Sequence, residues 1–297
     1  MLHKRCLMIV NAYYVWDSIA HFASRMGEEL KRLGIESDVR SAAYIYTYIN
    51  EKGELSSEKL PYDFILYLDK DKYISMMLEK AGYRLFNTSR AVELCDDKML
   101  TYLALTDQGL RLPKTVSAPL RYTRNEDENF LQNLVQKLKF PMIMKQNFGS
   151  MGKGVFLVQN EEELRKAEFQ NGLVPHLYQE FIDTSFGYDY RLILIGGKFY
   201  CGYRRRCLTG DFRSNLAQGG VGETCDITQA QIKAAEKAAA VLGLDYCGVD
   251  LLDSGDPEVP VLCEVNSNAF IKGAESITGK NIAKAYAEYL YQEVYLK

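Results

Sequence analysis

The sequence predicts an α/β protein in which a small parallel sheet precedes a larger α+β region built from antiparallel hairpins. In the first ninety or so residues, short apolar runs alternate with helical stretches, the pattern of parallel βαβ units. Further along, pairs of apolar runs are joined by glycine-rich turns, the pattern of β-hairpins. The chain has 297 residues, enough for about two domains or three small lobes.

The N-terminal α/β segment is predicted over residues 1–93. It has a strand within CLMIVNAYYV, a helix over 18–33 that ends at Gly34, and further strands at 36–39 and 62–68. No GxGxxG pattern follows the first strand, so we do not expect a dinucleotide-binding module.

Two further segments are expected, a central lobe over 94–178 and a C-terminal lobe over 179–297. The central lobe is predicted to hold helices at 94–109, 126–138 and 161–167, and strands at 141–147, 155–159 and 176–182. The C-terminal lobe is predicted to begin with a hairpin that turns at Gly196–Gly197. A helix follows that begins at the capping box of Thr228 and Gln231 and ends at Gly243. The strands CGVDLL and VLCEVN and a helix at 281–293 complete the lobe.

Composition narrows the function classes. The net charge of −3 and the pI of about 5.8 provide no broad attraction for nucleic acid, and no apolar run is long enough to span a bilayer. Seven cysteines without a CxxC pair give little support to disulfides or zinc, and three histidines make a histidine triad an unpromising route to catalysis. We expect a reduced, cytoplasmic environment.

The stretch VLCEVNSN places polar residues in an apolar strand. Period-2 alternation puts Glu264 and Asn266 on one face, and a turn centred near Pro257 brings Asp250 of CGVDLL opposite Glu264. Three oxygen donors without sulfur or nitrogen suit a hard cation such as Mg²⁺. The alternative is a solvated polar face that binds nothing.

The loop FGSMGKGV, residues 148–155, lies between two predicted strands. It is not a Walker A loop, because Lys153 is followed by glycine and a strand rather than by Ser/Thr and a helix. Its backbone N–H groups could still bind phosphate, although glycine hairpins are common.

Lys145 in the preceding strand needs an anion if it is buried; the alternative is a surface lysine. Lys98 is equally ambiguous by itself.

The segment YRRRCLTGDFRSN, residues 203–215, is the densest charge cluster in the chain. Pairing across the Gly196–Gly197 turn predicts that Asp189 lies opposite Arg204, with Arg191 and Arg206 on the same face. Arginines outnumber the nearby acids, which indicates a phosphate or a substrate carboxylate as ligand. A structural ladder of salt bridges is the alternative.

Taken in order along the chain, these motifs resemble the ATP-grasp superfamily, and most closely its RimK-like carboxylate–amine ligases. The resemblance runs from about Ser89 to Gly279 and is most specific at GDFRSN and EVN. It implies a nucleotide held between two α+β lobes that follow a small N-terminal domain. Arg204 departs from the pattern, in which a glutamate precedes the arginine pair.

The resemblance also implies roles for individual residues. Arg213 would stabilise the acyl phosphate and the tetrahedral oxyanion, and Arg205 and Arg206 would face the substrate. Asp250, Glu264 and Asn266 would bind two Mg²⁺ or Mn²⁺ ions. The implied ATP-binding residues are Lys98, Lys145, Ser150, Gly152, Glu180, Phe181, Asp189, Arg213, Ser214 and Asn215.

The implied activity is an ATP-dependent ligase. A substrate carboxylate attacks the γ-phosphate, and an amine then attacks the resulting acyl phosphate to form an amide. The expected amine is glutamate or another amino acid, and the expected carboxylate belongs to a small molecule, a peptide or a protein; no nucleic acid or membrane partner is expected, and a homo-oligomer is compatible with the sequence. The alternatives are a non-catalytic ATP-binding regulatory module and a kinase of the same fold.

Overall fold

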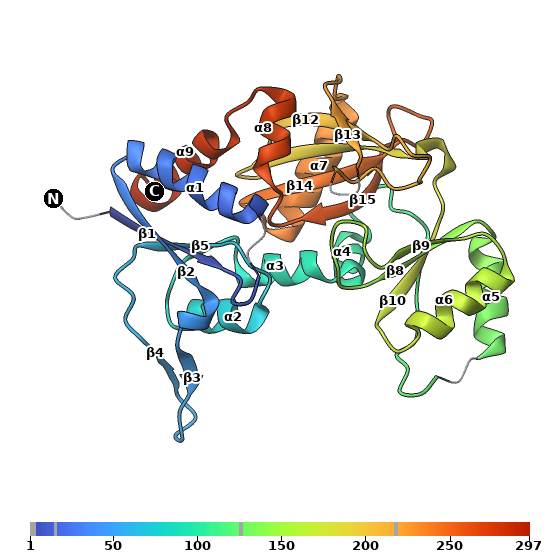
Figure 1. Cartoon of the computed structure of the whole chain (residues 1–297), viewed down its shortest axis with the longest axis horizontal. Coiled ribbons are helices and arrows are strands. Elements are labelled where there is room, and N and C mark those ends of the chain that lie inside the picture. Colours follow the sequence, from blue (N-terminus) through green and yellow to red (C-terminus); the bar gives the residue numbers. More distant parts are fainter. Residues whose placement is uncertain (1–3, 15–16, 125–126, 217–218) are drawn as a thin grey trace.

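The computed structural model describes residues 4–14, 17–124, 127–216 and 219–297. The chain folds into three lobes, each built around its own sheet (Figure 1). The N-terminal and C-terminal lobes lie side by side, and the central lobe projects from the far end of the C-terminal lobe. Among the described residues, no helix is long and apolar enough to cross a membrane.

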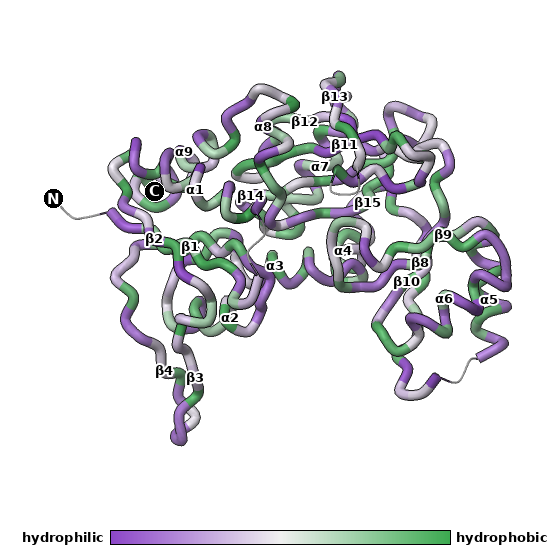
Figure 2. Tube along the Cα trace, viewed as in Figure 1, coloured by the Kyte–Doolittle hydropathy of each residue, from purple (hydrophilic) through white to green (hydrophobic). Residues whose placement is uncertain are grey.

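The N-terminal lobe contains the predicted parallel sheet, in the order β2-β1-β5-β6. Figure 2 shows hydrophobic residues along β1, in the interior of the lobe. A small hairpin of β3 and β4 projects away from the molecule. The elements of this lobe are β1 (Lys4–Val10), α1 (Asp17–Arg32), β2 (Ile35–Ser41), η1 (Ala42–Tyr44), β3 (Thr47–Ile49), β4 (Leu55–Ser57), β5 (Phe64–Tyr67), α2 (Lys72–Lys80) and β6 (Leu85–Phe86).

The central lobe is an antiparallel sheet in the order β7-β10-β8-β9, covered on one side by two helices. Leucines of α5 and α6 pack on Met142, Met144 and Tyr178 to form a separate core. The predicted helix start at Glu126 lies outside the described residues. The elements are β7 (Thr115–Ser117), α5 (Glu128–Leu138), β8 (Met142–Gln146), β9 (Val155–Val158), α6 (Glu161–Asn171) and β10 (His176–Glu180).

The C-terminal lobe is a larger antiparallel sheet in the order β13-β12-β11-β14-β15. The capping box of Thr228 and Gln231 and the left-handed Gly243 bound α7, as predicted. The elements are η2 (Asp183–Ser185), β11 (Tyr188–Ile195), β12 (Lys198–Arg206), β13 (Val221–Glu223), α7 (Gln229–Leu242), β14 (Tyr246–Leu252), β15 (Val261–Asn266), α8 (Ile271–Thr278) and α9 (Ile282–Tyr295).

The helix predicted over 94–109 was wrong in its bounds. The structure instead has α3 (Ser89–Asp96) and α4 (Lys98–Leu105). Asp97 separates them because its side chain caps the first turn of α4 by accepting hydrogen bonds from the backbone N–H groups of Met99 and Leu100. Both helices pack in one cluster with α7 and the strands β14 and β15, so this part of the predicted central segment is joined by packing to the C-terminal lobe.

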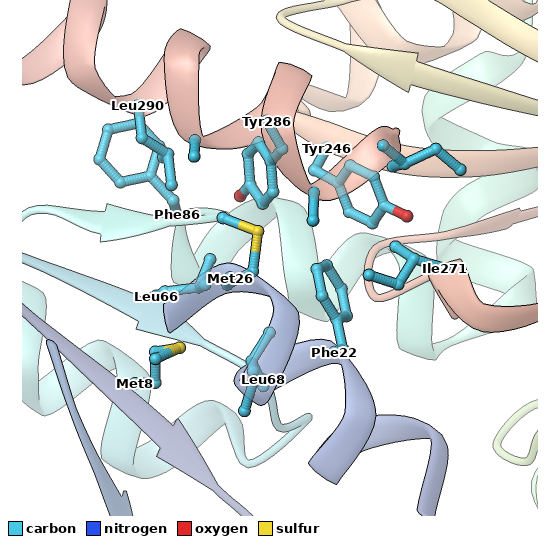
Figure 3. Packing of buried hydrophobic residues seen from close by; sticks show 14 of the residues in the cluster. Met8, Phe22, Met26, Leu66, Leu68, Phe86, Tyr246, Ile271, Tyr286 and Leu290 are labelled. Carbon is cyan, nitrogen blue, oxygen red and sulfur yellow. The ribbon is translucent and has the colours of Figure 1, made fainter. Parts of the chain in front are cut away.

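One hydrophobic core joins the N-terminal and C-terminal lobes. Phe22 of α1 contacts Tyr246 of β14, with ring centroids 5.4 Å apart, and Tyr246 stacks on Tyr286 of α9 at 4.8 Å. Figure 3 shows these rings together with Met26, Ile271 and Leu290 in a single layer between the lobes. The two lobes are therefore held together by burial of large apolar side chains.

This shared core generates a first prediction. Leu290 is fully buried in it, whereas Leu296, just beyond α9, is 68% exposed. We expect Leu290→Ala to lower the free energy of unfolding by about 2–5 kcal/mol, because it removes buried methyl groups and leaves a cavity. Leu296→Ala, the control, should change it by less than about 0.5 kcal/mol. Urea titrations followed by circular dichroism measure both, and equal midpoints would contradict the packing described here.

Candidate active site

Two cavities meet at the face of the C-terminal sheet. The first lies between the central and C-terminal lobes, and the second lies between the N-terminal and C-terminal lobes. Both are lined by Ser150, Arg205, Asn215 and Glu264, so these four residues mark the junction. A ligand that fills the first cavity therefore presents one end to a ligand in the second.

The predicted site residues come together from segments far apart in the chain. Asn266 lines the second cavity, and Arg206 lines neither. The others all line the first cavity: Lys98, Lys145, Ser150, Gly152, Glu180, Phe181, Asp189, Arg205, Arg213, Ser214, Asn215, Asp250 and Glu264.

Lys98 reaches the first cavity because of the cap at Asp97. The cap makes Lys98 the first residue of α4, and its backbone N–H donates to the carbonyl oxygen of Asn147 at 3.0 Å. Its Nζ donates to the carbonyl oxygen of Gly149 at 3.0 Å and lies 3.8 Å from Glu264 Oε1. Lys98 thus connects the glycine loop to the acidic strand β15.

Lys145 is the second cation in this cavity. It lies in β8, and its Nζ is 3.8 Å from Cys263 Sγ, with no carboxylate within ion-pair distance in the part of the chain that the structure describes. Burial lowers the pKa of Lys98; Glu264 opposes this shift, and the charges of Lys145 and Lys70 add to it. Two crowded lysines with one nearby carboxylate form a local site for an anion, although the chain as a whole is acidic.

The glycine loop between β8 and β9 lies over these lysines. Besides the bond from Lys98, the carbonyl oxygen of Gly152 accepts a hydrogen bond from Arg213 Nη1 at 3.2 Å. Gly154 has a φ of +72°, and a Cβ on it would lie 2.6 Å from Gln146 Oε1. The left-handed backbone conformation therefore favours glycine there, and a larger residue would also have to displace the Gln146 side chain.

Part of the lining of the first cavity is apolar. Ile143, Val155 and Leu252 line it, together with Phe181, whose ring packs edge-on against Phe186 and Phe212. Glu180 lines it too, but its Oε1 accepts hydrogen bonds from Arg111 Nη2 and the Lys114 backbone N–H, both at 2.8 Å. A cavity lined by apolar side chains as well as clustered cations suits a ligand with an apolar part and an anionic part.

The register predicted for the basic hairpin was wrong by one residue. The turn at Gly196–Gly197 is present, but a β-bulge follows in which Tyr200 is the extra residue, so Asp189 pairs with Arg205 rather than with Arg204. A one-residue insertion moves every later side chain to the opposite face. Arg205 therefore points into the cavities, while Arg204 and Arg206 bind Glu223 outside them.

Arg206, predicted to face the substrate, thus forms part of the salt-bridge ladder that was the alternative for this segment. Its Nη2 lies 2.8 Å from Glu223 Oε1, and its side chain is about half exposed. Arg205, in contrast, is almost completely buried and binds Asp189 in a bidentate arrangement.

Arg205 belongs to a buried network of alternating charges. Its Nη2 also lies 2.9 Å from Asp250 Oδ2, and Asp250 in turn binds Arg191 through both carboxylate oxygens. Burial alone would raise the pKa of Asp250, but the guanidinium groups of Arg191 and Arg205 hold it below its usual value. The network fixes the sheet face on which both cavities rest.

The acidic hairpin has the predicted pairing of Asp250 with Glu264. The strict alternation expected along β15 was wrong, however, because a second bulge makes Cys263 an extra residue between the pairs 250–264 and 251–262. Cys263 and Glu264 therefore both line the first cavity, although they are neighbours in one strand.

The oxygen donors of this hairpin are of the type that hard divalent cations prefer. Asp250 accepts three guanidinium N–H groups, which leaves about one of its four lone-pair positions. Glu264 has one cation nearby, Lys98 at 3.8 Å, and Asn266 could offer a cation only its amide oxygen, because its Nδ2 group is a hydrogen-bond donor. No cluster of three or more His, Cys, Asp or Glu residues that could hold a metal ion occurs in the described ranges, so an ion here would need the amide oxygen of Asn266 beside the two carboxylates.

Arg213 lies at the rim of the first cavity. Its Nη2 and Nε bind Asp211 at 2.7 and 3.0 Å, and this pairing holds the pKa of Asp211 below its usual value. Because Asp211 orients the guanidinium toward the loop carbonyl of Gly152, Arg213 joins the C-terminal lobe to the glycine loop. Ser214 and Asn215 continue this wall toward the junction.

Sequence reasoning missed the contribution of the N-terminal lobe. Asn11 and Asp69 line the second cavity, and they directly or closely follow β1 and β5. Ligands of parallel sheets bind at the carboxyl ends of the strands, so this signal was available once the strands were placed. Lys272 of α8 lines the same cavity but follows no recognisable pattern.

Comparison with known proteins gives a family match over most of the chain. The model for the RimK-like ATP-grasp domain matches residues 95–290. Human beta-citrylglutamate synthase B is 33% identical over 223 residues, covering 74% of this chain and 56% of that protein. The probable alpha-L-glutamate ligase of Halorhodospira halophila is 34% identical over 214 residues, covering 71% and 68%. The chain thus spans about half the length of several curated relatives it matches.

Solved structures show the same fold at lower identity. A RimK domain ATP-grasp protein from Sphaerobacter thermophilus superposes with a TM-score of 0.70 at 16% identity, covering 96% of this chain and 99% of that one. D-alanine–D-alanine ligase from Bacillus anthracis gives 0.68 at 18% identity, covering 99% and 97%. The three-lobed arrangement is therefore that of ATP-grasp proteins.

The buried network generates a second prediction, for neighbouring arginines on opposite faces of β12. Arg205→Ala leaves Asp189 and Asp250 buried without a shared cation, so we expect it to lower the free energy of unfolding by about 3–5 kcal/mol. Arg206→Ala, the control, should cost about 0–1 kcal/mol because its ion pair is exposed. Urea titrations at neutral pH measure both.

The difference in free energy of unfolding between the wild type and Arg205→Ala should depend on pH because of Asp250. Its pKa is lowered in the folded state, so the stabilisation is present above the unfolded value of about 3.9 and is lost as the pH falls through the folded value. The gap between wild type and Arg205→Ala should therefore narrow in acid. A gap that is small at neutral pH, or that widens below about pH 4, would contradict the network.

Proposed function

Because the chain belongs to the RimK-like ATP-grasp family, we propose that it is an ATP-dependent ligase that joins a carboxylate to an amine through an acyl phosphate. The observation that carries this proposal is the junction of the two cavities at Ser150, Arg205, Asn215 and Glu264. A nucleotide in the first cavity would present its terminal phosphate to substrates in the second.

The first cavity supports the assignment of ATP as co-substrate. The adenine ring would lie against the apolar lining residues such as Phe181, and the triphosphate would lie beneath the glycine loop near Ser150 and Gly152. Lys98 and Lys145 would neutralise phosphate charge. Asp189 would approach the ribose through whichever carboxylate lone pairs its bidentate bond to Arg205 leaves available.

Asp250, Glu264 and Asn266 would hold the divalent ions, Mg²⁺ or Mn²⁺, in the proposed site. When bound, such ions neutralise phosphate charge and reduce its repulsion of an attacking carboxylate. The residues of the chain supply position and charge. Lys145 and Lys98 hold the phosphates, and Ser214 and Asn215 orient the terminal group at the junction.

Two bond-forming steps would follow. The substrate carboxylate oxygen attacks the γ-phosphorus and ADP leaves, which produces an acyl phosphate. The nitrogen of the deprotonated amine then attacks the acyl carbon, the bond between that carbon and the phosphate oxygen breaks, and one proton of the nitrogen leaves with the phosphate as the amide forms. Arg213, at the rim beside the glycine loop, would stabilise the negative charge of the acyl phosphate and of the tetrahedral oxyanion.

The names of the relatives support glutamate as the amine. They are a beta-citrylglutamate synthase, an N-acetylaspartylglutamate synthase and a probable alpha-L-glutamate ligase. We therefore propose L-glutamate as the amine and a carboxylate such as citrate or N-acetylaspartate, or that of a peptide, as its partner.

The reaction class is tested with hydroxylamine, which traps acyl phosphates as hydroxamates. With Mg-ATP and either citrate or N-acetylaspartate, we expect hydroxamate and an equal amount of ADP. Glu264→Gln should lower the rate by at least about a hundredfold, because it removes the negative charge of a proposed metal ligand at the junction. Phosphorylated product without hydroxamate would instead indicate a kinase, and nucleotide binding without turnover of these or peptide carboxylates would indicate a regulatory module.

The nucleotide assignment is tested at Lys145. Lys145→Ala should raise the KM for ATP by roughly ten- to a hundredfold, because a phosphate loses one charge-assisted hydrogen bond. Lys166→Ala is the matched control, since Lys166 lies in the same lobe on the exposed side of α6. Initial-rate measurements across ATP concentrations give both values. An unchanged KM in Lys145→Ala would remove this residue from the ATP site.

A further inference from the structure

The second cavity contains a carboxylate that the proposed ATP and metal sites do not use. Its acidic lining residues, among those described, are Glu264 and Asp69. Asp69 comes from the N-terminal lobe, just beyond β5. Its Oδ1 accepts a hydrogen bond from the Lys70 backbone N–H at 2.8 Å, and both oxygens lie 3.2 Å from Asn11 Nδ2.

Asp69 has no cationic partner within the described residues. The nearest lysine in sequence, Lys70, directs its Nζ to Asp96 at 2.9 Å instead. Burial raises the pKa of Asp69, the hydrogen bonds from Lys70 and Asn11 oppose this shift, and the negative charges of Asp71 and Asp96 add to it. A half-buried carboxylate without a counter-ion is unfavourable. The lining of the cavity thus provides a place for a cation brought by a ligand.

Two residues that line this cavity also carry buried polar atoms without a hydrogen-bond partner. Ser267 is 2% exposed, yet its Oγ has no hydrogen-bond partner, and the buried Asn266 Nδ2 has none either. Both residues line the same cavity as Asp69. Buried polar atoms are normally paired, but these two atoms have almost no exposed surface, so a ligand would reach them only after a small shift of the side chains.

Asp69 is held close to the junction by the segment that follows β15. Asn268 Nδ2 donates to the Asp69 carbonyl oxygen at 3.2 Å, and Asn268 is two residues beyond Asn266. The Asn11 side chain is itself fixed, because its Oδ1 accepts hydrogen bonds from the backbone N–H groups of Tyr13 and Tyr14, both at 3.0 Å. The carboxylate is therefore positioned from both lobes.

We infer that Asp69, oriented by Asn11, binds the ammonium group of the amine substrate, so that the N-terminal lobe selects this substrate. The inference rests on the proposed function. An ammonium group supplies both the positive charge and the N–H donors that the exposed lone pairs of Asp69 lack. A carboxylate substrate would be repelled from the same position.

The test compares two aspartates of one loop in the full-length protein. Asp69→Asn removes the cavity charge with little change of shape. Asp71→Asn removes a charge two residues away, but asparagine can still cap α2, as Asp71 does. Calorimetry with L-glutamate as the probe, in the presence of Mg-ADP, should show a Kd raised roughly ten- to a hundredfold by Asp69→Asn. The Kd should change less than about twofold in Asp71→Asn.

Two further measurements separate binding of the ammonium from other roles. N-acetyl-L-glutamate, which lacks the positive charge, should bind the wild type more weakly than L-glutamate. Hydroxamate formation with hydroxylamine, which is uncharged at neutral pH, should fall by a much smaller factor in Asp69→Asn than the affinity for L-glutamate does. If Asp69→Asn fails to fold, Asn11→Ala replaces it, with a smaller increase in Kd expected.

Several outcomes would overturn the inference. These are an unchanged Kd for L-glutamate in Asp69→Asn, equal losses in both variants, equal affinity of the wild type for N-acetyl-L-glutamate, or no binding of L-glutamate by the wild type. Failure of the proposed function would be seen in a different assay, because no hydroxamate would then form. The comparison of Kd values for L-glutamate would still decide whether Asp69 binds the ammonium group.

Discussion

The shared guanidinium of Arg205 is the interaction on which the site depends. It neutralises Asp189 and Asp250 within the C-terminal sheet and lines both cavities at their junction. Buried carboxylates would otherwise require protonation or water. Because their charge is balanced inside the sheet, Lys98 and Lys145 remain available to an external anion. A buried structural network thus sets the electrostatics of a binding site.

The lobes that form the two cavities are joined by different contacts. The lobes around the second cavity share one core, in which Phe22, Tyr246 and Tyr286 pack across the boundary. The central lobe, which forms one wall of the first cavity, has its own core around α5 and α6. The carbonyl oxygens of the glycine loop accept hydrogen bonds from Lys98 and from Arg213 of the C-terminal lobe. The central lobe is also joined by packing, since Leu177 of β10 belongs to the cluster that α4 forms with α7 and the C-terminal sheet.

Most of the proposed site could be predicted from motifs, and the departures have one physical cause. The pairing of Asp250 with Glu264 follows from turn position and alternation. The partner of Asp189 does not, because a single bulge at Tyr200 shifts the register and places Arg205 inside and Arg206 outside. The bulge at Cys263 acts similarly on β15. A bulge adds one residue to one strand, and the tight turns and apolar runs around it look the same with or without it.

By itself, the sequence determined the fold class, the parallel and antiparallel regions, the capped helix at 229–242 and the polar residues that chemistry requires. These features are local, since periodicity, caps and turns act over a few residues. Only the tertiary structure decided which arginine faces the cavities, that Asp97 directs Lys98 to the glycine loop, and that Asp69 joins a cavity formed largely by the C-terminal lobe. Such facts depend on register and on packing between segments nearly two hundred residues apart, for which neighbouring residues carry little information.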